Sequence, residues 1–464
     1  MNRKEEYLAL RRELDEAPPA LADTLTRARA RLRARRRRFV AFPAGGLAAA
    51  ALLFVVLVNT STSFAYACGQ IPGLKSLAQF VALSPSLSAA VENAYVQPVE
   101  QEKTQDGITA RVEYLIVDQK QLNIFFSMRA ENGHITDVTP EVRASDGGHL
   151  SGYSLSSGSP LTENGELRQI TVDFTENDMP DEMRLILKAR DAGSGTAQAE
   201  APARAADAPH ETWKEPEYDT AFSFDLSFDP YFTATGETIV LEREITLDAQ
   251  RLILKTAEVY PTHMRLNFED QDGNTAWLKA LDFYMIDERG KRFDPIANGI
   301  TATGSTDSPM MASHRLESAY FAGAKELTLV ITGVTWLDHD MQRVRVDLAH
   351  ASAQALPEGV TLDSVERRGQ SWTLRFWAQE QKENASYQLF LPTYYDEKGT
   401  EYSFSSWTSG ARGYYDEEKG EWVETPGFFD TEFTLMDYPY DAVYLTPVYS
   451  RRVTLDVPVE IRIK

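Results

Sequence analysis

Residues 39–58 are twenty consecutive residues without a charged side chain, and they follow a run of arginines: Arg35, Arg36, Arg37 and Arg38. As an α-helix with a rise of about 1.5 Å per residue, the stretch would be about 30 Å long, the thickness of a bilayer's hydrocarbon core. It leaves 38 residues before it and 406 after it. The sequence therefore predicts one transmembrane helix at 39–58 in a single-pass membrane protein.

Charge predicts the orientation of this helix. Residues 1–38 contain twelve Lys/Arg and six Asp/Glu, a net charge of +6, whereas the whole chain carries −22. Because 39–58 is uncharged, the body after it carries −28. Positive charge beside a span marks its cytoplasmic side, so we expect a cytoplasmic N-terminus and an extracytoplasmic body in the cell membrane. A body this acidic repels nucleic acid.

Two alternatives to a transmembrane helix are a cleaved signal peptide and a lipoprotein anchor. Ala65-Tyr66-Ala67 fits the small-x-small pattern of a signal-peptide cleavage site, although 1–38 and 39–58 are both longer than the matching parts of a typical signal. Cys68, the single cysteine, could mark a lipoprotein, but Ala65 stands where leucine is usual. A single cysteine forms no internal disulfide, so the core alone must stabilise the body.

The basic tail, 1–38, contains two helical patterns separated by Pro18-Pro19. Tyr7, Leu10 and Leu14 form an apolar stripe at helical spacing, which could bind a cytoplasmic partner as a helix in a groove. The alternative is that the tail is only an anchor. We expect Arg35 to Arg38 to lie on anionic membrane lipid, where each arginine contributes about 1 kcal/mol.

The body is predicted to be mainly β. Short helices are expected in the membrane-proximal segment 59–97, where Ser84-Pro85 is typical of a helix start. After Pro98, apolar residues alternate with polar ones between Gly, Asn and Asp turns, which indicates β-strands. The region 191–209 is rich in Ala, Gly, Ser and Pro and is predicted to be a mobile loop.

Similar strand patterns open at Ile108, Ile245 and Val360 and indicate three units of about 110 residues, the first of which is longer. Each unit also ends with an alternating strand, at 222–226, 344–348 and 457–463. Many short strands in units of this length are typical of immunoglobulin-like β-sandwiches. We therefore predict three such sandwiches in tandem, at 98–230, 237–348 and 360–464.

The sequence carries no sign of enzymatic chemistry. It contains no G-x-S-x-G, Walker or H-E-x-x-H motif, and its seven histidines have no metal-ligand spacing. The acidic run 269–274 is similar to a calcium loop but lacks the distal glutamate, so Asp272-Gly273 predicts a hairpin turn. We expect no catalytic residue, no metal and no cofactor.

The third unit is unusually rich in aromatic residues, most of which the alternation assigns to its core. Tyr414 and Tyr415 are consecutive, so one of them must face away from the other on a strand. Tyr and Trp are favoured in contact surfaces. Trp407, Tyr414 and Tyr415 are therefore the candidate face for an envelope ligand, a peptide or a glycan.

Three segments carry a resemblance to a known family: Val58-Asn59-Thr60-Ser61-Thr62-Ser63-Phe64-Ala65, Ile71-Pro72-Gly73-Leu74 and Ala90-Val91-Glu92-Asn93-Ala94-Tyr95-Val96-Gln97-Pro98-Val99. They resemble an uncharacterised family of single-pass proteins from Clostridium- and Bacillus-like Gram-positive bacteria with extracytoplasmic immunoglobulin-like domains. The family is described as anti-sigma-factor-like. The resemblance implies a role in signal transduction and a cytoplasmic sigma factor as partner.

Two functions follow from these observations. In the first, the chain is a membrane-anchored regulator whose tail binds a cytoplasmic partner and whose body senses or binds something outside. In the second, the tail is only an anchor, and the body is an adhesion or scaffold module of the envelope.

Overall fold

The computed structural model describes residues 74–131, 135–157, 165–174, 177–191, 220–233, 235–296, 309–379, 388–416 and 421–464. These ranges are mainly β, as predicted, with six antiparallel sheets and a few short helices. No helix within them is long and apolar enough to cross a membrane. The predicted span at 39–58, the tail and most of the predicted loop 191–209 lie outside the described residues.

The described chain begins with short helices, α5 (Leu74–Phe80), η1 (Val81–Leu83) and α6 (Pro85–Glu92). Ser84 is extended and Pro85 starts α6, where its missing N–H costs no hydrogen bond. Leu77, Val81, Leu87 and Val91 are buried and join the core of the first pair of sheets. These helices therefore fix the entry of the chain onto the β body.

Unit one consists of two sheets, in the orders β1-β2-β3-β6-β5 and β4-β7-β8. Its strands are β1 (Gln97–Gln105), β2 (Ile108–Val117), β3 (Gln121–Ala130), β4 (Ile135–Ala144), β5 (Tyr153–Ser157), β6 (Leu167–Phe174), β7 (Glu182–Asp191) and β8 (Thr220–Ser227). Both sheets contribute to one core, with Ile124 and Val172 from the first and Leu185 and Phe224 from the second. A short helix, α7 (Pro230–Thr233), leads to unit two.

Unit two pairs the sheet β14-β11-β10-β9 with the sheet β13-β12-β15-β25. Its elements are β9 (Glu237–Leu247), β10 (Gln250–Val259), β11 (Met264–Asp270), β12 (Ala276–Asp287), β13 (Arg292–Phe293), β14 (Ser313–Leu316), η2 (Tyr320–Ala322), β15 (Leu327–Asp338) and, from the end of the chain, β25 (Arg451–Arg462). Trp336 is fully buried in its core.

Unit three pairs the sheet β17-β16-β24-β20-β21 with the sheet β18-β19-β23-β22. Its strands are β16 (Val344–Asp347), β17 (Ser352–Ala353), β18 (Val360–Arg368), β19 (Ser371–Gln379), β20 (Phe390–Tyr395), β21 (Glu401–Ser403), β22 (Ser406–Asp416), β23 (Glu421–Leu435) and β24 (Ala442–Pro447). Its core holds Phe376, Phe390 and Phe433, with Tyr394 and Tyr438 beside them.

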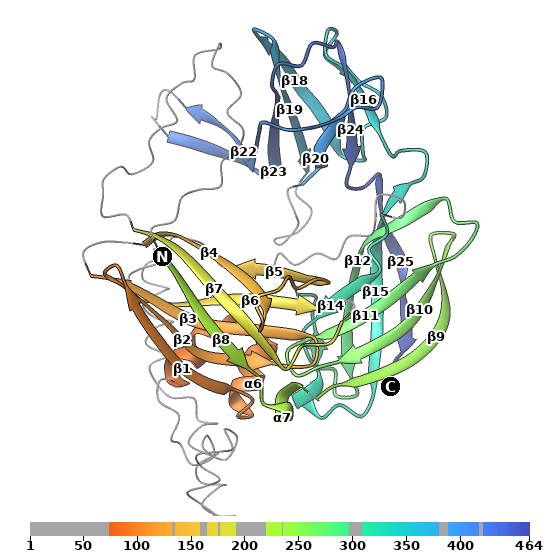
Figure 1. Cartoon of the computed structure of the whole chain (residues 1–464). Helices are drawn as coiled ribbons and strands as arrows, with labels where there is room; N and C mark the ends of the chain where they lie inside the picture. Colours follow the sequence, from red (N-terminus) through yellow and green to blue (C-terminus); the bar gives the residue numbers. More distant parts are fainter. Residues whose placement is uncertain are drawn as a thin grey trace, which may run out of the picture.

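The predicted tandem order is wrong for two strands. We expected 344–348 to close the second unit and 457–463 to close the third. Instead, β16 pairs with β24 in unit three, and β25 pairs with β15 in unit two. In Figure 1 the dark-blue β25 lies beside the cyan β15, away from the other blue strands. Unit three is thus inserted between β15 and the last strand of unit two.

Strand length explains why β25, and not β16, pairs with β15. β15 has twelve residues and so does β25, and their ladder extends from Thr328↔Arg462 to Trp336↔Arg451. β16 has only four residues and would leave most of the β15 edge without backbone partners. β25 also places Ile461 and Ile463 in the core of unit two. Apolar and polar residues alternate in both β16 and β25, so the sequence pattern predicts that each is a strand but not which strand it pairs with.

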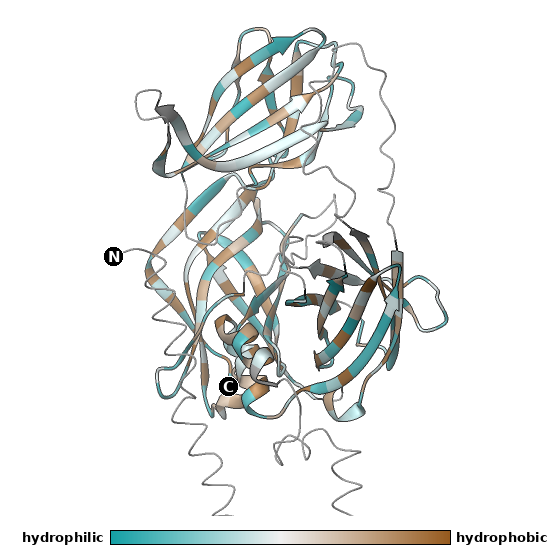
Figure 2. Ribbon diagram, turned by 90° about the vertical axis from the view of Figure 1, so that its left-hand side faces the viewer, coloured by the Kyte–Doolittle hydropathy of each residue, from teal (hydrophilic) through white to brown (hydrophobic). Residues whose placement is uncertain are grey.

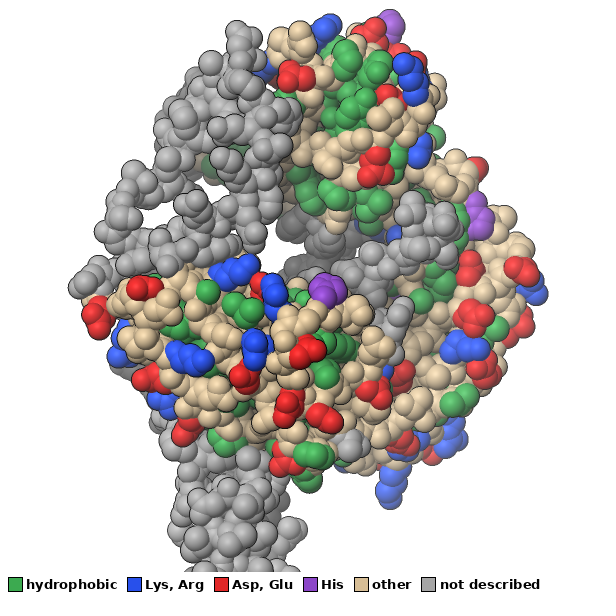
Figure 3. Space-filling model, in the orientation of Figure 1, with side chains coloured by type: hydrophobic (Ala, Val, Ile, Leu, Met, Phe, Trp, Pro, Cys, Tyr) green, Lys and Arg blue, Asp and Glu red, His purple; other side chains and the backbone are tan. Residues whose placement is uncertain are grey.

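Units one and two lie side by side, and unit three lies beyond them, above β25 in Figure 1. Hydrophobic and hydrophilic residues alternate along the strands (Figure 2), as expected of sheets with one buried face. In Figure 3, acidic and basic side chains are interspersed over units one and two, whereas hydrophobic side chains gather on the visible face of unit three.

Candidate functional site

Two of the predicted sites lie outside the described residues: the stripe Tyr7, Leu10 and Leu14, and the basic run Arg35 to Arg38. The third, formed by Trp407, Tyr414 and Tyr415, lies on β22. Its members are partly exposed where described, with Trp407 at 40% and Tyr414 at 58%. The side chain of Tyr415 lies outside the described part.

The structure does not bring Trp407 and Tyr414 together. Trp407 pairs with Phe433 and Tyr414 with Val423, seven residues further along β22, which is about 23 Å at a strand rise of about 3.3 Å per residue. Another aromatic residue, Trp422, lies across Gly413, where an added Cβ would come within 2.5 Å of the indole nitrogen. The three predicted residues share a strand but do not form one patch.

Metal chemistry finds no support in the described residues. None of them form a group of three or more His, Cys, Asp and Glu side chains that could hold an ion. The acidic run 269–274 contains the end of β11 and the turn that leads to β12, in which the Asn274 side-chain amide donates to the carbonyl of Arg251 at 2.7 Å. The predicted hairpin is wrong, because β11 and β12 belong to different sheets.

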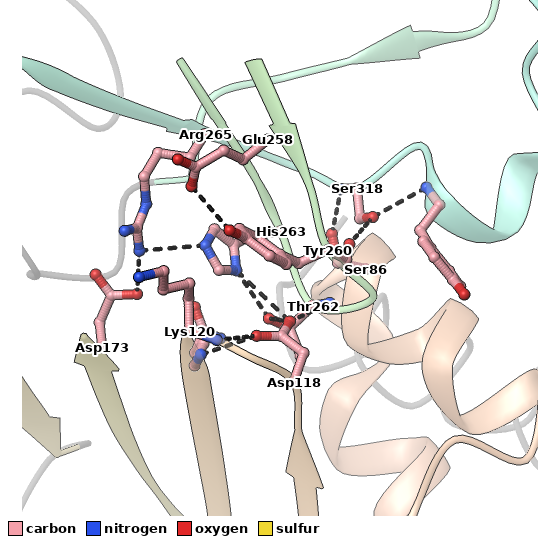
Figure 4. A network of polar contacts seen from close by, with 12 residues as sticks. Ser86, Asp118, Lys120, Asp173, Glu258, Tyr260, Thr262, His263, Arg265 and Ser318 are labelled. Carbon is pink, nitrogen blue, oxygen red and sulfur yellow. Dashed lines mark hydrogen bonds and ion pairs between the residues drawn. The ribbon is translucent and has the colours of Figure 1, made fainter. Parts of the chain in front are cut away.

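A site that the sequence did not indicate lies between units one and two, and Figure 4 shows it in detail. It begins at Asp118, which follows β2 and is fully buried. One carboxylate oxygen accepts the backbone N–H groups of Lys120 and Gln121 at 2.9 and 2.8 Å, which closes the β2–β3 turn. The other accepts the backbone N–H and the hydroxyl of Thr262 in unit two, at 3.0 and 2.6 Å.

Equivalent turn aspartates occur in the other units but bond only locally. Asp287 accepts the N–H groups of Arg289 and Lys291, and Asp396 accepts those of Lys398 and Thr400. Each of the three carboxylates is at least 95% buried. Of the three, Asp118 therefore has the additional role of joining two units.

His263 continues the contact into unit two. The Thr262 hydroxyl donates to Asp118, so it accepts from His263 Nδ1–H at 2.9 Å. His263 Nε2 then accepts from the Arg265 guanidinium at 3.3 Å. This chain of donors requires the neutral imidazole with its proton on Nδ1. Burial, with Arg315 and Arg265 nearby, lowers the pKa of His263 well below its ordinary value, in agreement with that neutral state.

Arg265 returns the network to unit one. Its guanidinium donates to the Asp173 carboxylate at 2.8 Å and to the Phe174 carbonyl at 3.1 Å, both on β6. A second arginine, Arg315 on β14, lies 3.8 Å from Asp173 and donates to the Gln121 side chain. We call Asp118, Gln121, Asp173, Thr262, His263, Arg265 and Arg315 the junction network.

The charges of the junction network balance when His263 is neutral. Two buried carboxylates, Asp118 and Asp173, face two buried guanidinium groups, Arg265 and Arg315. Burial raises the pKa of Asp118, and the donors from Thr262, Lys120 and Gln121 oppose that rise. Buried charges are stable only when paired and hydrogen-bonded. The network therefore sets one relative position of units one and two, and any displacement would leave charges unpaired.

The same junction holds α6. Ser86, in the first turn of this helix, donates its backbone N–H to Glu317 at 2.7 Å and accepts the backbone N–H of Ser318 at 2.6 Å. Ser318 in turn donates to the Tyr260 carbonyl, two residues before Thr262. Just after α6, the Tyr95 ring packs edge-on against Phe232 and Phe321, with centroids 4.8 and 5.6 Å away. Helix α6 is thus bonded to unit two while its apolar face belongs to unit one.

Sequence reasoning missed this site because its partners are far apart in the chain: Asp118 and Thr262 are separated by 144 residues. The local pattern gave no signal either. In β11, Arg265 alternates with Met264 and Leu266 like the polar residues Asn267 and Glu269 that follow it, which is typical of a strand with one solvent-exposed face. The structure shows instead that Arg265 is buried and ion-paired.

Two family models match parts of the chain. A domain of unknown function (DUF4179) matches residues 35–130, and a family of unknown function (DUF5643) matches residues 236–358. The first match extends from the basic run through β3 and overlaps the segments that carry the resemblance. The second covers β9 to β17 and so includes β16 but not β25.

No curated protein matches the chain. A solved structure, described as the crystal structure of the conserved domain protein from Bacillus anthracis, is similar at 13% sequence identity and a TM-score of 0.36. The similarity covers 56% of this chain and 84% of that one.

Proposed function

We propose that the chain is a single-pass, membrane-anchored regulator of the anti-sigma-factor-like kind. Its tail binds a cytoplasmic partner, and its immunoglobulin-like units sense a ligand on the other side of the membrane. The basic tail, the apolar stretch 39–58 and the acidic body support this layout. The match of DUF4179 to residues 35–130, which contain the apolar stretch, supports it as well.

One structural observation carries the proposal. Helix α6 begins 26 residues after the end of the apolar stretch. It packs in the core of unit one and is hydrogen-bonded to Glu317 and Ser318 of unit two. A change in the angle between these units must therefore either move α6 or break its bonds to Glu317 and Ser318. A simple anchor would need no such connection. The arrangement is suited to transmitting an event in the body to the segment that leads to the membrane.

The test uses the full chain in its source cells, with crosslinking across the cytoplasmic tail and recovery of the crosslinked partner. We expect recovery of a sigma factor and its loss in a Leu10→Asp, Leu14→Asp variant, because charges in the apolar stripe would prevent groove binding. Arg3→Gln, outside the stripe, is the matched control and should retain the partner. Recovery of lipid alone, unchanged by these substitutions, would leave the tail as an anchor and contradict the proposal.

A further inference from the structure

Strand β22 forms one edge of its sheet, and among the described residues no strand pairs with its outer side. Its first six residues, 406–411, pair in continuous register with 434–429 of β23 until a bulge between Ala411 and Gly413. None of these six residues is charged. In an antiparallel pair, alternate residues of the edge strand direct N–H and C=O groups away from the partner. Residues 406–411 therefore present a flat row of backbone donors and acceptors.

The other long sheet edges in the described residues carry features that prevent pairing with a further strand. Proline or adjacent charged residues interrupt them: Pro98 in β1, Pro140 in β4, Glu242 to Glu244 in β9, Glu366 to Arg368 in β18 and Pro458 in β25. The β8 edge contains neither feature, but its carbonyl oxygens at Ser227 and Asp225 accept hydrogen bonds from the Gln97 and Gln101 side chains of β1, at 2.8 and 3.0 Å. Proteins block sheet edges in this way because an open edge pairs with another strand. The first half of β22 lacks these features.

Aromatic side chains accompany the open edge. Trp407 lies within it, while Tyr414 and Trp422 project further along the same hairpin, exposed by 58% and 56%. Gly413 leaves space for the Trp422 indole, since an added Cβ would come within 2.5 Å of the indole nitrogen. Peptides that add a strand to a sheet gain affinity from main-chain hydrogen bonds and specificity from side-chain contacts beside the edge. β22 offers both.

The negative charge around β22 indicates which kind of partner could bind its open edge. Residues 406–435 contain seven Asp/Glu and only two Lys/Arg, and the whole body carries −28. A second copy of this chain would bring the same negative charge to the edge and be repelled, whereas a peptide with lysine or arginine would be attracted. Such a peptide could also place its cations over Tyr414 or Trp422. We infer that the 406–411 edge of β22 binds an extended cationic peptide as an added β-strand.

The test uses the full chain in zwitterionic detergent micelles, which do not attract a cationic peptide by charge. The probe is a fluorescent eight-residue peptide of alternating lysine and valine. Two comparison peptides carry glutamate in place of lysine, or proline in place of every valine. We expect at least tenfold weaker binding of both, and slowed amide hydrogen exchange at 406–411 when the first peptide is bound. Equal binding of the proline peptide, or slowed exchange only elsewhere, would overturn the inference.

Variants of the protein sharpen the test. Thr408→Pro and Ser409→Pro remove N–H groups that point to opposite sides of β22, so one of them affects only the open edge. The variant that keeps the wild-type melting temperature should bind the peptide at least tenfold more weakly. Val457→Pro, at an exposed position of the β25 edge, is the control and should bind normally. If both β22 variants unfold, the exchange pattern of the wild-type protein decides.

Self-association is the competing occupant. A concentration-dependent dimer that slows exchange at 406–411 without peptide would overturn the choice of a cationic partner. The binding measurement does not involve the cytoplasmic tail, so it succeeds or fails independently of the proposed regulator function.

Discussion

The two junctions of this molecule are built in different ways. Units one and two meet through side chains of the junction network, which are buried and ionisable. Units two and three are joined by the backbone, because each contains a strand that the chain order would have assigned to the other. The first kind of junction can open by breaking a few polar contacts, whereas the second is held by two short covalent connections of the chain. We therefore expect motion at the first junction and rigidity at the second.

Short connections reinforce the rigid junction. Only residues 339–343 lead from β15 to β16, and only 448–450 lead from β24 to β25. Ser450 fixes both: its N–H donates to the Trp336 carbonyl at 2.7 Å, and its hydroxyl donates to Asp338 at 2.7 Å. Arg451 adds an ion pair to Asp338 at 3.0 Å. Unit three therefore has little freedom to rotate against unit two.

Removing β25 should have the largest effect. A chain that ends at Tyr449 loses the ladder partner of β15 and the core residues Ile461 and Ile463. We expect unit two, rather than unit three, to lose its cooperative unfolding transition in calorimetry. The matched control replaces residues 340–449 by a glycine–serine linker and keeps β25, so it should retain that transition. If the truncated chain unfolds like wild type, the exchanged strand is not part of unit two's fold.

Asp118→Ala should separate units one and two. It leaves the Thr262 N–H and hydroxyl buried without their acceptor and removes one of the two carboxylates that balance Arg265 and Arg315, which costs about 3–5 kcal/mol for the loss of a buried charge. We expect the two units to unfold in separate calorimetric transitions, with faster proteolysis at 228–236. Asp396→Ala removes a similarly buried turn aspartate from unit three and should leave the junction between units one and two intact. The same outcome for both variants would show that Asp118 has only a local role.

Acid should weaken unit two. Burial lowers the pKa of His314 to about 4 and that of His263 well below its ordinary value. The unfolded state then binds more protons below about pH 6.5, so stability is full above that pH and falls towards pH 4, by about 3 kcal/mol for His314 alone. Burial raises the pKa of Asp118 and Glu317, which acts in the opposite direction.

Denaturant unfolding at a series of pH values measures this effect. His314→Gln and His263→Gln should each reduce the dependence on pH between 6.5 and 4. A slope that neither substitution changes would assign the acid sensitivity to other groups.

Thr262→Val should have the smallest effect. It keeps the shape of the side chain but removes the hydroxyl between Asp118 and His263, at a cost of about 1–2 kcal/mol. A double-mutant cycle with Asp118→Ala measures the coupling. Additive losses would mean that the hydroxyl does not take part in the network.

Patterns that are local in sequence predicted much of this fold. Period-2 runs indicated the β body, and the openings at Ile108, Ile245 and Val360 indicated three units. The same patterns could not predict the exchange of β16 and β25, because alternation describes a strand and not its neighbour. The junction network was also out of reach, since Asp118, Asp173 and Arg265 come from distant turns and strands. Trp407 and Tyr414 were predicted to form one face, but the register of β22 separates them by seven residues.

If the junction between units one and two controls α6, loosening this junction must reduce the protection of the helix. Amide hydrogen exchange of residues 86–92 in the full chain measures that protection in wild type, in Asp118→Asn and, as control, in Asp396→Asn. We expect faster exchange in α6 for Asp118→Asn only, because a loosened junction weakens the Ser86 contacts to Glu317 and Ser318. Unchanged exchange in α6 of an Asp118→Asn protein with a loosened junction would show that the junction does not control the helix.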